Sequence, residues 1–136
     1  MDLLKSLFVS ASGLKAQNGR MRIIAENIAN SDSTGRTPDQ DPYRRKIPTF
    51  QNYFDKEIGG DVVELGKVVE DRSPFELKYE PGHPAADANG YVRQPNVNTL
   101  IETVDMREAQ RSYEANLNVV EATRRMVQRT IDILRG

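Results

Sequence analysis

The stretch TLIETVDMREAQRSYEANLNVVEATRRMVQRTIDILR, residues 99–135, decides the fold of this chain. It contains no glycine or proline, and its apolar residues keep a seven-residue spacing at Met106, Tyr113, Val120, Val127 and Leu134. Such a repeat places side chains along one side of an α-helix, where they form a seam for another helix. We therefore predict one long helix here. Its expected start is a capping box, with Thr99 as the N-cap and Glu102 reaching back to it.

The beginning of the chain carries a similar pattern between residues 3 and 30. Spacings of three and four connect Leu4, Leu7, Ala11, Leu14, Asn18, Met21, Ala25 and Ile28. Asp2 is a suitable N-cap for a helix here, and the turn formers of residues 31–35 end it. We expect the two stripes to pack against each other. The predicted fold class is mainly α with a small β-rich insertion, built on an elongated, antiparallel and coiled-coil-like pair of long terminal helices.

Two glycines, Gly13 and Gly19, lie inside the first helix, where each costs about 1 kcal/mol relative to alanine. One interpretation is that the helix tolerates this weakness. The other is that a neighbouring backbone approaches closely over residues 10–13. The sequence leaves both open.

The middle of the chain, residues 36–98, is predicted to be extended and β-rich. Its prolines forbid a long helix, residues 61–69 and 75–79 have strand-like patterns, and Asn89-Gly90 is a strong signal for a tight turn. The expected organisation is a helical core domain formed by residues 1–35 and 99–136, with residues 36–98 as the middle segment.

Composition narrows the class of protein. Only 38% of the 136 residues are hydrophobic, and the mean hydropathy is −0.63, so the core should be thin. Net charge is −1 overall, and no segment has the basic excess that nucleic acid requires. There are no cysteines. The opening residues do not fit a cleavable signal peptide, and no run approaches the roughly 20 apolar residues of a membrane span.

The residues that carry chemistry are sparse. His83, the single histidine, lies between Gly82 and Pro84, and an enzyme would have to use it with Asp87 or Glu80. No metal-ligand spacing or phosphate-binding glycine loop occurs, so no catalytic, metal or cofactor site is expected. The one basic cluster, residues 44–46, fits either a charged strand edge or a contact with acidic groups on a neighbour.

The helix seams are therefore the predicted functional surface. We expect them to form an assembly interface, because long helices in a thin-cored chain expose more apolar surface than one partner helix covers. The predicted interface residues are Leu4, Leu7, Ala11, Leu14, Asn18, Met21, Ala25, Ile28, Met106, Tyr113, Asn116, Leu117, Val120, Val127, Ile131 and Leu134. Asn18, Asn116, Thr123 and Thr130 interrupt the stripes, either to fix register and partner or because they face solvent.

Several motifs, spread over almost the whole chain, resemble those of the bacterial flagellar axial proteins. They are Ser10-Ala-Ser-Gly-Leu-Lys-Ala-Gln17, Arg20-Met21, Ala25-Glu-Asn-Ile-Ala-Asn30, Pro42-Tyr-Arg-Arg45, Gly90-Tyr-Val92, Pro95-Asn-Val-Asn98 and Arg111-Ser-Tyr-Glu-Ala-Asn116. The later motifs are similar to those of the proximal-rod branch. The short middle segment agrees with that branch, since hook and distal-rod proteins have larger middle domains.

This resemblance implies a non-enzymatic structural subunit of the proximal rod in the flagellar basal body, part of the torque-transmitting drive shaft. It implies assembly through the terminal helices with copies of itself, other rod proteins and the export-gate or MS-ring adaptor at the rod base. It also implies type III export without a cleaved signal, and a place in the rod across the periplasm. The alternative is a cytoplasmic coiled-coil adaptor that oligomerises through the same seams.

Overall fold

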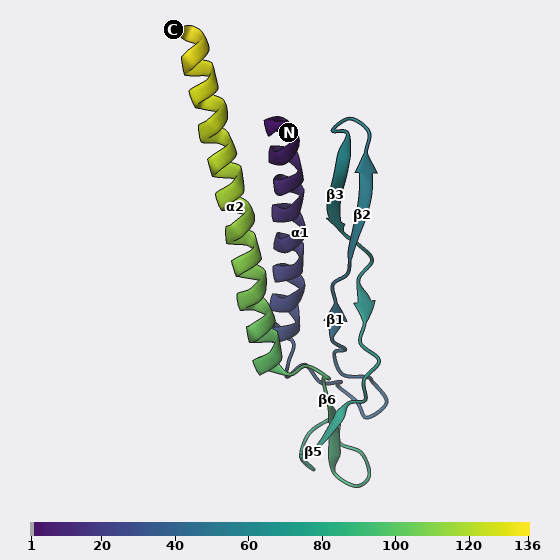
Figure 1. Ribbon diagram of the computed structural model, residues 1–136. Coiled ribbons are helices and arrows are strands. Elements are labelled where there is room, and N and C mark those ends of the chain that lie inside the picture. Colours follow the sequence, from purple (N-terminus) through teal and green to yellow (C-terminus); the bar gives the residue numbers. More distant parts are fainter. Residues whose placement is uncertain (1) are drawn as a thin grey trace. The chain divides into compact units, whose positions relative to one another are not determined.

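The computed structural model describes residues 2–136 and contains two long helices (Figure 1). Helix α1 comprises Leu3–Ala29 and helix α2 comprises Thr99–Arg135. Gly13 lies opposite Asn116, and Arg20 lies opposite Glu108, so the residue numbers run in opposite directions along the pair. The predicted antiparallel pair of terminal helices is confirmed.

The middle segment forms six short strands. They are β1 (Lys46–Ile47), β2 (Phe50–Asp55), β3 (Gly60–Leu65), β4 (Val69–Glu70), β5 (Glu76–Tyr79) and β6 (Tyr91–Gln94). They pair antiparallel as β1 with β4, β2 with β3 and β5 with β6. The predicted turn at Asn89-Gly90 leads into β6, and Gly90 adopts a φ of +87° that favours glycine. The fold is thus mainly α with a small strand-rich middle, as predicted.

The chain divides into two compact units, and each contains part of both helices. The first unit comprises the start of the chain up to Met21, Thr49–Lys67 and Arg107–Gly136, and so holds the β2–β3 hairpin. The second comprises Arg22–Pro48 and Val68–Met106, and so holds the other two sheets. The three-part division of the sequence stays a prediction.

In the first unit, small residues of α1 allow close packing. A Cβ on Gly13 would lie 2.9 Å from Nδ2 of Asn116, and a Cβ on Gly19 would lie 2.9 Å from Cδ2 of Leu65. The hydroxyl of Ser12 also accepts a hydrogen bond from the Val63 amide at 3.3 Å. Both glycines therefore mark close approach. The approaching atoms belong to side chains of α2 and β3, and not to a neighbouring backbone.

The apolar core is thin in both units. The buried hydrophobic residues are Ala16, Ile23, Ile24, Val62, Ala85, Val92 and Ala109, and three of these seven are alanines. Polar side chains are buried beside them, among them Asn27 and Glu102 with at most 1% of their surface exposed. Polar contacts must therefore help to specify the packing.

The predicted capping box at the start of α2 is wrong. Oδ1 of Asn98 accepts hydrogen bonds from the amides of Leu100 (3.1 Å) and Ile101 (3.4 Å), so Asn98 is the N-cap. The Glu102 side chain turns away from the cap toward Arg45 and Asn27. The box fails because the charged guanidinium of Arg45 binds this buried carboxylate more strongly than a solvated backbone amide does.

Truncation of the core residue Ile24 tests this packing. Ile24 is 2% exposed, and Ile24→Ala should lower the free energy of unfolding by about 2–4 kcal/mol, as measured by urea denaturation of the isolated chain. Leu4→Ala is the matched control, because Leu4 is 54% exposed and its truncation should cost about 0.5 kcal/mol or less. Equal losses from the two changes would contradict this core.

Candidate assembly interface

Half of the predicted stripe of α1 is exposed. Leu4 is 54% exposed, Ala11, Asn18 and Ala25 are also exposed, and the remaining members are half-buried. Phe8, beside the stripe, is 51% exposed. The structure therefore leaves two large apolar side chains near the start of α1, Leu4 and Phe8, exposed, while the same face further along carries Lys15, Asn18 and Arg22.

A different face of α1 packs within the chain. It comprises the buried residues Ser10, Gly13, Ala16, Ile23, Ile24 and Asn27. The members of the stripe at Leu7, Leu14, Met21 and Ile28 are half-buried, so the expectation that the two stripes pack against each other stays a prediction. Gly13 allows α1 to approach Asn116 of α2 closely, and an apolar period alone does not show which face a partner covers.

The stripe of α2 is covered along only part of its length. Met106, Tyr113, Asn116, Leu117, Val120 and Val127 are half-buried. Ile131 is 39% exposed and Leu134 is 82% exposed. Every residue from Gln128 to the end is exposed. The seam of α2 therefore continues beyond the surface that its own chain covers.

Three of the four polar interruptions of the seams, all on α2, bond within their own helix. Thr123 is 5% exposed, and its hydroxyl donates to the carbonyl of Val119 at 2.8 Å. Nδ2 of Asn116 donates to the carbonyl of Ser112 at 3.1 Å. Asn18 and Thr130 are exposed. Hydrogen bonds to the preceding turn of the same helix satisfy these groups without selecting a partner.

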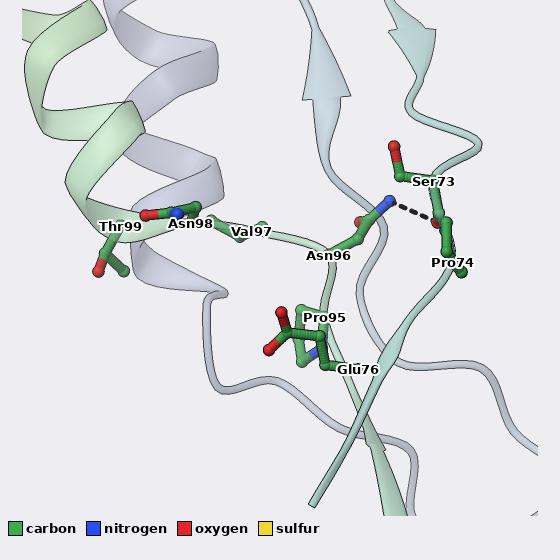
Figure 2. A pocket seen from close by; sticks show the side chains of 8 residues that line it. All are labelled: Ser73, Pro74, Glu76, Pro95, Asn96, Val97, Asn98 and Thr99. Carbon is green, nitrogen blue, oxygen red and sulfur yellow. Dashed lines mark hydrogen bonds between the residues drawn. The ribbon is translucent and has the colours of Figure 1, made fainter.

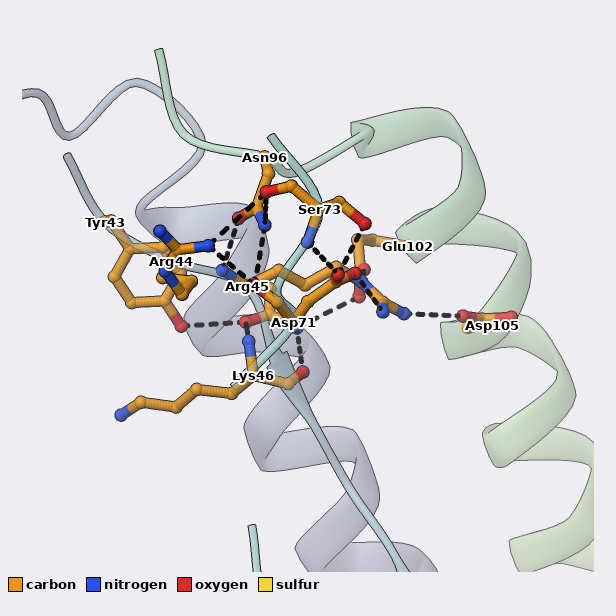
Figure 3. A network of polar contacts seen from close by, with 10 residues as sticks. Tyr43, Arg44, Arg45, Lys46, Asp71, Ser73, Asn96, Glu102 and Asp105 are labelled. Carbon is orange, nitrogen blue, oxygen red and sulfur yellow. Dashed lines mark hydrogen bonds and ion pairs between the residues drawn. The ribbon is translucent and has the colours of Figure 1, made fainter. Parts of the chain in front are cut away.

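The second unit contains a polar network that includes Tyr43, Lys46 and Glu102 (Figure 3). Asn27, which is fully buried, bonds to all three of these residues. Its Oδ1 accepts hydrogen bonds from the Tyr43 hydroxyl at 2.7 Å and the Lys46 amide at 3.0 Å. Its Nδ2 donates to the Lys46 carbonyl at 2.9 Å and to Oε2 of Glu102 at 3.3 Å. One side chain thus connects the end of α1, strand β1 and the first turn of α2.

Arg45 forms the charged half of this network. Its Nε donates to Oε1 of Glu102, and its other nitrogens approach Asp71 (3.3 Å) and Asp105 (3.8 Å). Burial lowers the pKa of Arg45, but the hydrogen bond and charge of Glu102, followed by those of Asp71, outweigh burial and raise that pKa above its ordinary value. The guanidinium therefore stays charged beside a carboxylate that is 1% exposed.

Two further groups of the network have shifted pKa values. Hydrogen bonds from the hydroxyl and amide of Ser73 lower the pKa of Asp71, with Arg45 adding to the effect. Burial, with the charges of Glu26 and Glu102, raises the pKa of Tyr43 to about 12. At neutral pH the Asp71 carboxylate is charged and accepts the hydrogen bonds from Ser73. The Tyr43 phenol is neutral and donates its hydrogen bond to Asn27.

The basic cluster at residues 44–46 therefore has a role that neither sequence interpretation described. Arg44 lies over the ring of Phe75, 4.3 Å from its centroid, and donates to the Asp71 carbonyl at 3.0 Å. Lys46 pairs with Glu26. Together with the Arg45 pairs, these contacts place all three cations against groups of their own chain.

Asn96 connects this network to a groove of about 410 Å³ between residues 73–76 and residues 95–99 (Figure 2). Its Nδ2 donates to the carbonyls of Asp71 (3.0 Å) and Ser73 (3.1 Å). Its Oδ1 accepts from the Arg45 amide at 2.7 Å. Both groups of the amide hold neighbouring backbone, so we assign Asn96 a structural role at the wall of the groove.

His83 is held in a turn by both ring nitrogens. Nδ1 accepts from the Ala85 amide at 3.0 Å, and Nε2 lies 3.2 Å from the Thr34 hydroxyl. Glu80 pairs with Lys78 at 2.9 Å, and Asp87 accepts from the backbone of the Asn89-Gly90 turn. Across residues 2–136, the acidic and histidine side chains form no group of three or more that could hold a metal ion. No helix in that range is long and apolar enough to span a membrane.

Sequence reasoning missed the buried network, although its parts lie in motifs that it had singled out. Asn27 falls in the motif of residues 25–30, Tyr43 and Arg45 in that of residues 42–45, and Asn96 in that of residues 95–98. These motifs meet in space around Glu102. The signal that the sequence offered for this network was the presence of polar residues in segments predicted to be extended or to form turns.

Two family models match the ends of the chain. The family described as "Flagella basal body rod protein" matches residues 7–35. The family described as "Flagellar basal body rod FlgEFG protein C-terminal" matches residues 88–133. These two matches cover most of α1 and most of α2, the elements that dominate the fold.

Similar chains extend the match to nearly the full length. A protein named flagellar basal-body rod protein FlgC from Agrobacterium fabrum is 54% identical, covering 94% of this chain and 92% of the relative. FlgC of Borreliella burgdorferi is 41% identical over the whole of both chains. FlgC of Bacillus subtilis is 38% identical, covering 98% of this chain and 99% of the relative.

The paired terminal helices, the strand-rich middle and these matches together define a structural subunit of the bacterial flagellar basal-body rod. The chain belongs to the FlgC family of flagellar basal-body rod proteins. The alternative of a cytoplasmic coiled-coil adaptor is not favoured by these relatives.

Removal of Arg45 tests the buried ion pair. Arg45→Met should lower the free energy of unfolding by about 3–5 kcal/mol, because it leaves the Glu102 carboxylate buried without a cation. The double variant Arg45→Met/Glu102→Leu should recover much of that loss, since no charge is left buried. Arg72→Met, at an exposed arginine, is the control and should be nearly silent in urea denaturation. A double variant as unstable as Arg45→Met would show that the pair is not the cause.

The raised pKa of Tyr43 predicts a loss of stability at high pH. A pKa of about 12 in the folded chain lies above the ordinary value of 10.0, so the neutral phenol contributes stability that is fully present below pH 10 and is lost as the pH rises toward about 12. Unfolding free energies across this range should fall more steeply for the wild type than for Tyr43→Phe. Tyr53→Phe, at a tyrosine 45% exposed, should keep the wild-type slope. If the unfolding free energy fell with pH at the same slope in all three chains, the raised pKa of Tyr43 would be contradicted.

Proposed function

We propose that this rod subunit assembles through the uncovered stripes of α1 and α2, and that it belongs to the proximal part of the rod. The observation that carries the proposal is the exposure of apolar residues on α1, with Leu4 at 54% and Phe8 at 51%, away from the face that packs within the chain. Contiguous exposed apolar surface on a folded chain is typical of an interaction site.

The energetics support assembly as the event that completes the fold. Burial of an exposed leucine or isoleucine against a neighbour contributes roughly 1.5–3 kcal/mol. The core of the single chain consists largely of alanine, valine and isoleucine, whereas ordering each residue costs about 1–2 kcal/mol. Contacts between subunits supply the missing burial, so we expect folding of the helix ends to be coupled to assembly.

The proposed partners are copies of this chain, other rod proteins, and the export-gate or MS-ring adaptor at the base of the rod. The resemblance of the terminal motifs to axial proteins supports these partners. It also supports delivery by the flagellar type III export machinery without a cleaved signal, and a place in the rod across the periplasm. No nucleic acid or membrane insertion enters the proposal, which agrees with a net charge of −1.

The proposed role is mechanical and not enzymatic. A drive shaft must resist shear between subunits, and long helices that interlock along their sides distribute a torque over many small contacts. His83, the residue an enzyme would have needed, is engaged through both ring nitrogens in a turn. Torque transmission therefore depends on the helices, while the buried network of the second unit holds their adjoining ends.

A charge placed on the α1 stripe tests the interface. Leu4→Asp should leave the isolated chain folded, because Leu4 is already 54% exposed, but should abolish swimming in cells that lack the wild-type gene. A carboxylate in a packed interface costs several kcal/mol unless it is paired. Asn118→Asp is the matched control, at an exposed α2 position outside the predicted interface, and should permit swimming.

Purified basal bodies then separate the possible causes of lost motility. The Leu4→Asp chain should reach the periplasm but be missing from rods, whereas the Asn118→Asp chain should be present in them. Normal swimming with Leu4→Asp would contradict the proposed interface.

A further inference from the structure

Strand β2 has an open outer edge in the first unit. Figure 1 shows β3 between α1 and β2. The Val63 amide of β3 donates to the Ser12 hydroxyl of α1, and Val62 is only 4% exposed. A Cβ on Gly60 of β3 would lie 2.5 Å from Cε of Lys5. Five of the six residues of β2 are exposed, so α1 covers one side of the hairpin and leaves the other side open.

The hydrogen-bond ladder shows which backbone groups of β2 face outward. The Gly66 amide donates to the Thr49 carbonyl at 2.6 Å, directly beside the paired residues 50–55 and 60–65. In an antiparallel ladder only every second pair exchanges hydrogen bonds. The amides and carbonyls of Phe50, Asn52 and Phe54 therefore point away from β3, and no residue in the range 2–136 bonds to them.

The sequence of β2 does not protect this edge. Proteins discourage pairing at an edge strand with proline or lysine, and Phe-Gln-Asn-Tyr-Phe-Asp, residues 50–55, contains neither. Phe50 is 42% exposed, Tyr53 45% and Phe54 60%. A two-stranded ribbon is marginally stable in water, and a third strand adds main-chain hydrogen bonds to it. The edge of β2 therefore fits an extended segment of a partner.

Strand β5 in the second unit has a similar free edge. The Glu80 amide donates to the Gly90 carbonyl at 2.9 Å, so by the same alternation the backbone groups of Leu77 and Tyr79 point away from β6. Their side chains are 61% and 63% exposed. Lys78 lies between them and pairs with Glu80 at 2.9 Å, which balances its charge. Strand β5 thus presents outward backbone groups beside exposed apolar and aromatic side chains.

Charge and symmetry favour β5 as the strand that pairs with β2. Residues 50–65 contain four acidic residues and one basic residue, a net charge of −3, so two such hairpins repel each other, whereas β5 contains one residue of each sign. An edge that meets itself also needs a two-fold axis, which closes the contact at two copies. The outer edges of β3 and β6 are engaged, by Ser12 and by Asp87, which bonds to the amide and carbonyl of Tyr91.

We infer that β5 of one copy adds antiparallel to the outer edge of β2 in a second copy, with Phe50 opposite Tyr79 and Asn52 opposite Leu77. The outward backbone groups of these residues face each other and form about four hydrogen bonds. Their side chains share one face of the new pair, so the two aromatic rings meet. This inference rests on the proposed function, because it requires copies that assemble.

The register follows from the charges on the other face. In this register Gln51 lies opposite Lys78. A shift by two residues along β2 would place Asp55 opposite Glu76, and like charges directly opposite each other destabilise a strand pair. The contact joins two hairpins into one sheet of four strands shared by two copies. Each copy offers its β2 to one neighbour and its β5 to another, so the contact repeats in an open series.

Proline at position 52 tests the free edge. Asn52→Pro removes an outward amide and blocks an added strand, but it keeps the bonds to β3 because this amide takes no part in them. Asn52→Thr is the matched control, since it changes the side chain and keeps the amide. Both isolated chains should unfold at the same urea concentration. In cells that also express the wild type at an equal level, purified basal bodies should contain about tenfold less of the proline chain than of the threonine chain.

Either of two results from this pair of variants would overturn the inference. One is equal incorporation of the proline and threonine chains. The other is loss of the folded hairpin in the isolated Asn52→Pro chain, since it would show that the amide at position 52 bonds within its own chain.

Cysteine cross-linking tests the partner strand and the register. The chain has no cysteine, and positions 51 and 78 would form a pair with Cα atoms about 4.5 Å apart, within the range of a disulfide. Cells that express Gln51→Cys and Lys78→Cys chains together, distinguished by a size tag, should yield a mixed disulfide in purified basal bodies after mild oxidation. Either chain alone should give about tenfold less dimer. Tyr53→Cys with Lys78→Cys should do the same, because those positions lie about 7–8 Å apart.

The outcomes separate this inference from the proposed function. Absence of the tagged chain without cysteine from basal bodies would contradict the proposed function and the inference that rests on it. Presence of both cysteine chains in basal bodies without the mixed disulfide would overturn the inference alone, and so would a Gln51→Cys homodimer that exceeds the mixed product.

Discussion

The buried Arg45–Glu102 ion pair is the interaction on which the arrangement of the second unit depends. It joins a residue beside β1 to the first turn of α2, and Asn27 adds the last turns of α1 to the same cluster. A buried pair of this kind contributes little net stability compared with an apolar replacement, because desolvation offsets much of the attraction. Its larger effect is on specificity, since any other arrangement of these three segments would leave a charge buried alone.

Because polar contacts hold these segments, α1 and α2 bury little of their apolar surface against each other. With their adjoining ends held by polar contacts, α1 and α2 need little apolar area to pack against each other in the first unit, where Gly13 and Asn116 form part of the contact. The fit is incomplete, since Oε1 of Gln17 is buried with no hydrogen-bond partner among the described residues. Weak packing within the chain leaves larger apolar side chains such as Leu4 and Phe8 exposed, where they form part of the proposed interface.

The sequence predicted the elements better than their faces. Helices α1 and α2, their antiparallel pairing and the turn before β6 follow from local patterns of period, proline and glycine. The face that packs within the chain does not follow, because a stripe such as Leu4 to Leu14 shows only that some partner is needed. The Arg45–Glu102 pair, 57 residues apart, was equally hidden, since charge partners so distant in sequence leave no periodic signal. Arg45 lay in one of the family motifs, whereas Glu102 had been assigned to the capping box.

The charge polarity of α2 is more than the helix needs for itself. Basic residues near a helix C-terminus interact favourably with the helix dipole, but that effect decays within the last turn. Arg135 lies in that turn, whereas Arg124, Arg125 and Arg129 lie one or more turns before it. Mutual repulsion among these cations weakens the last turns of α2 in the isolated chain. Their placement is therefore not explained by the stability of the single helix.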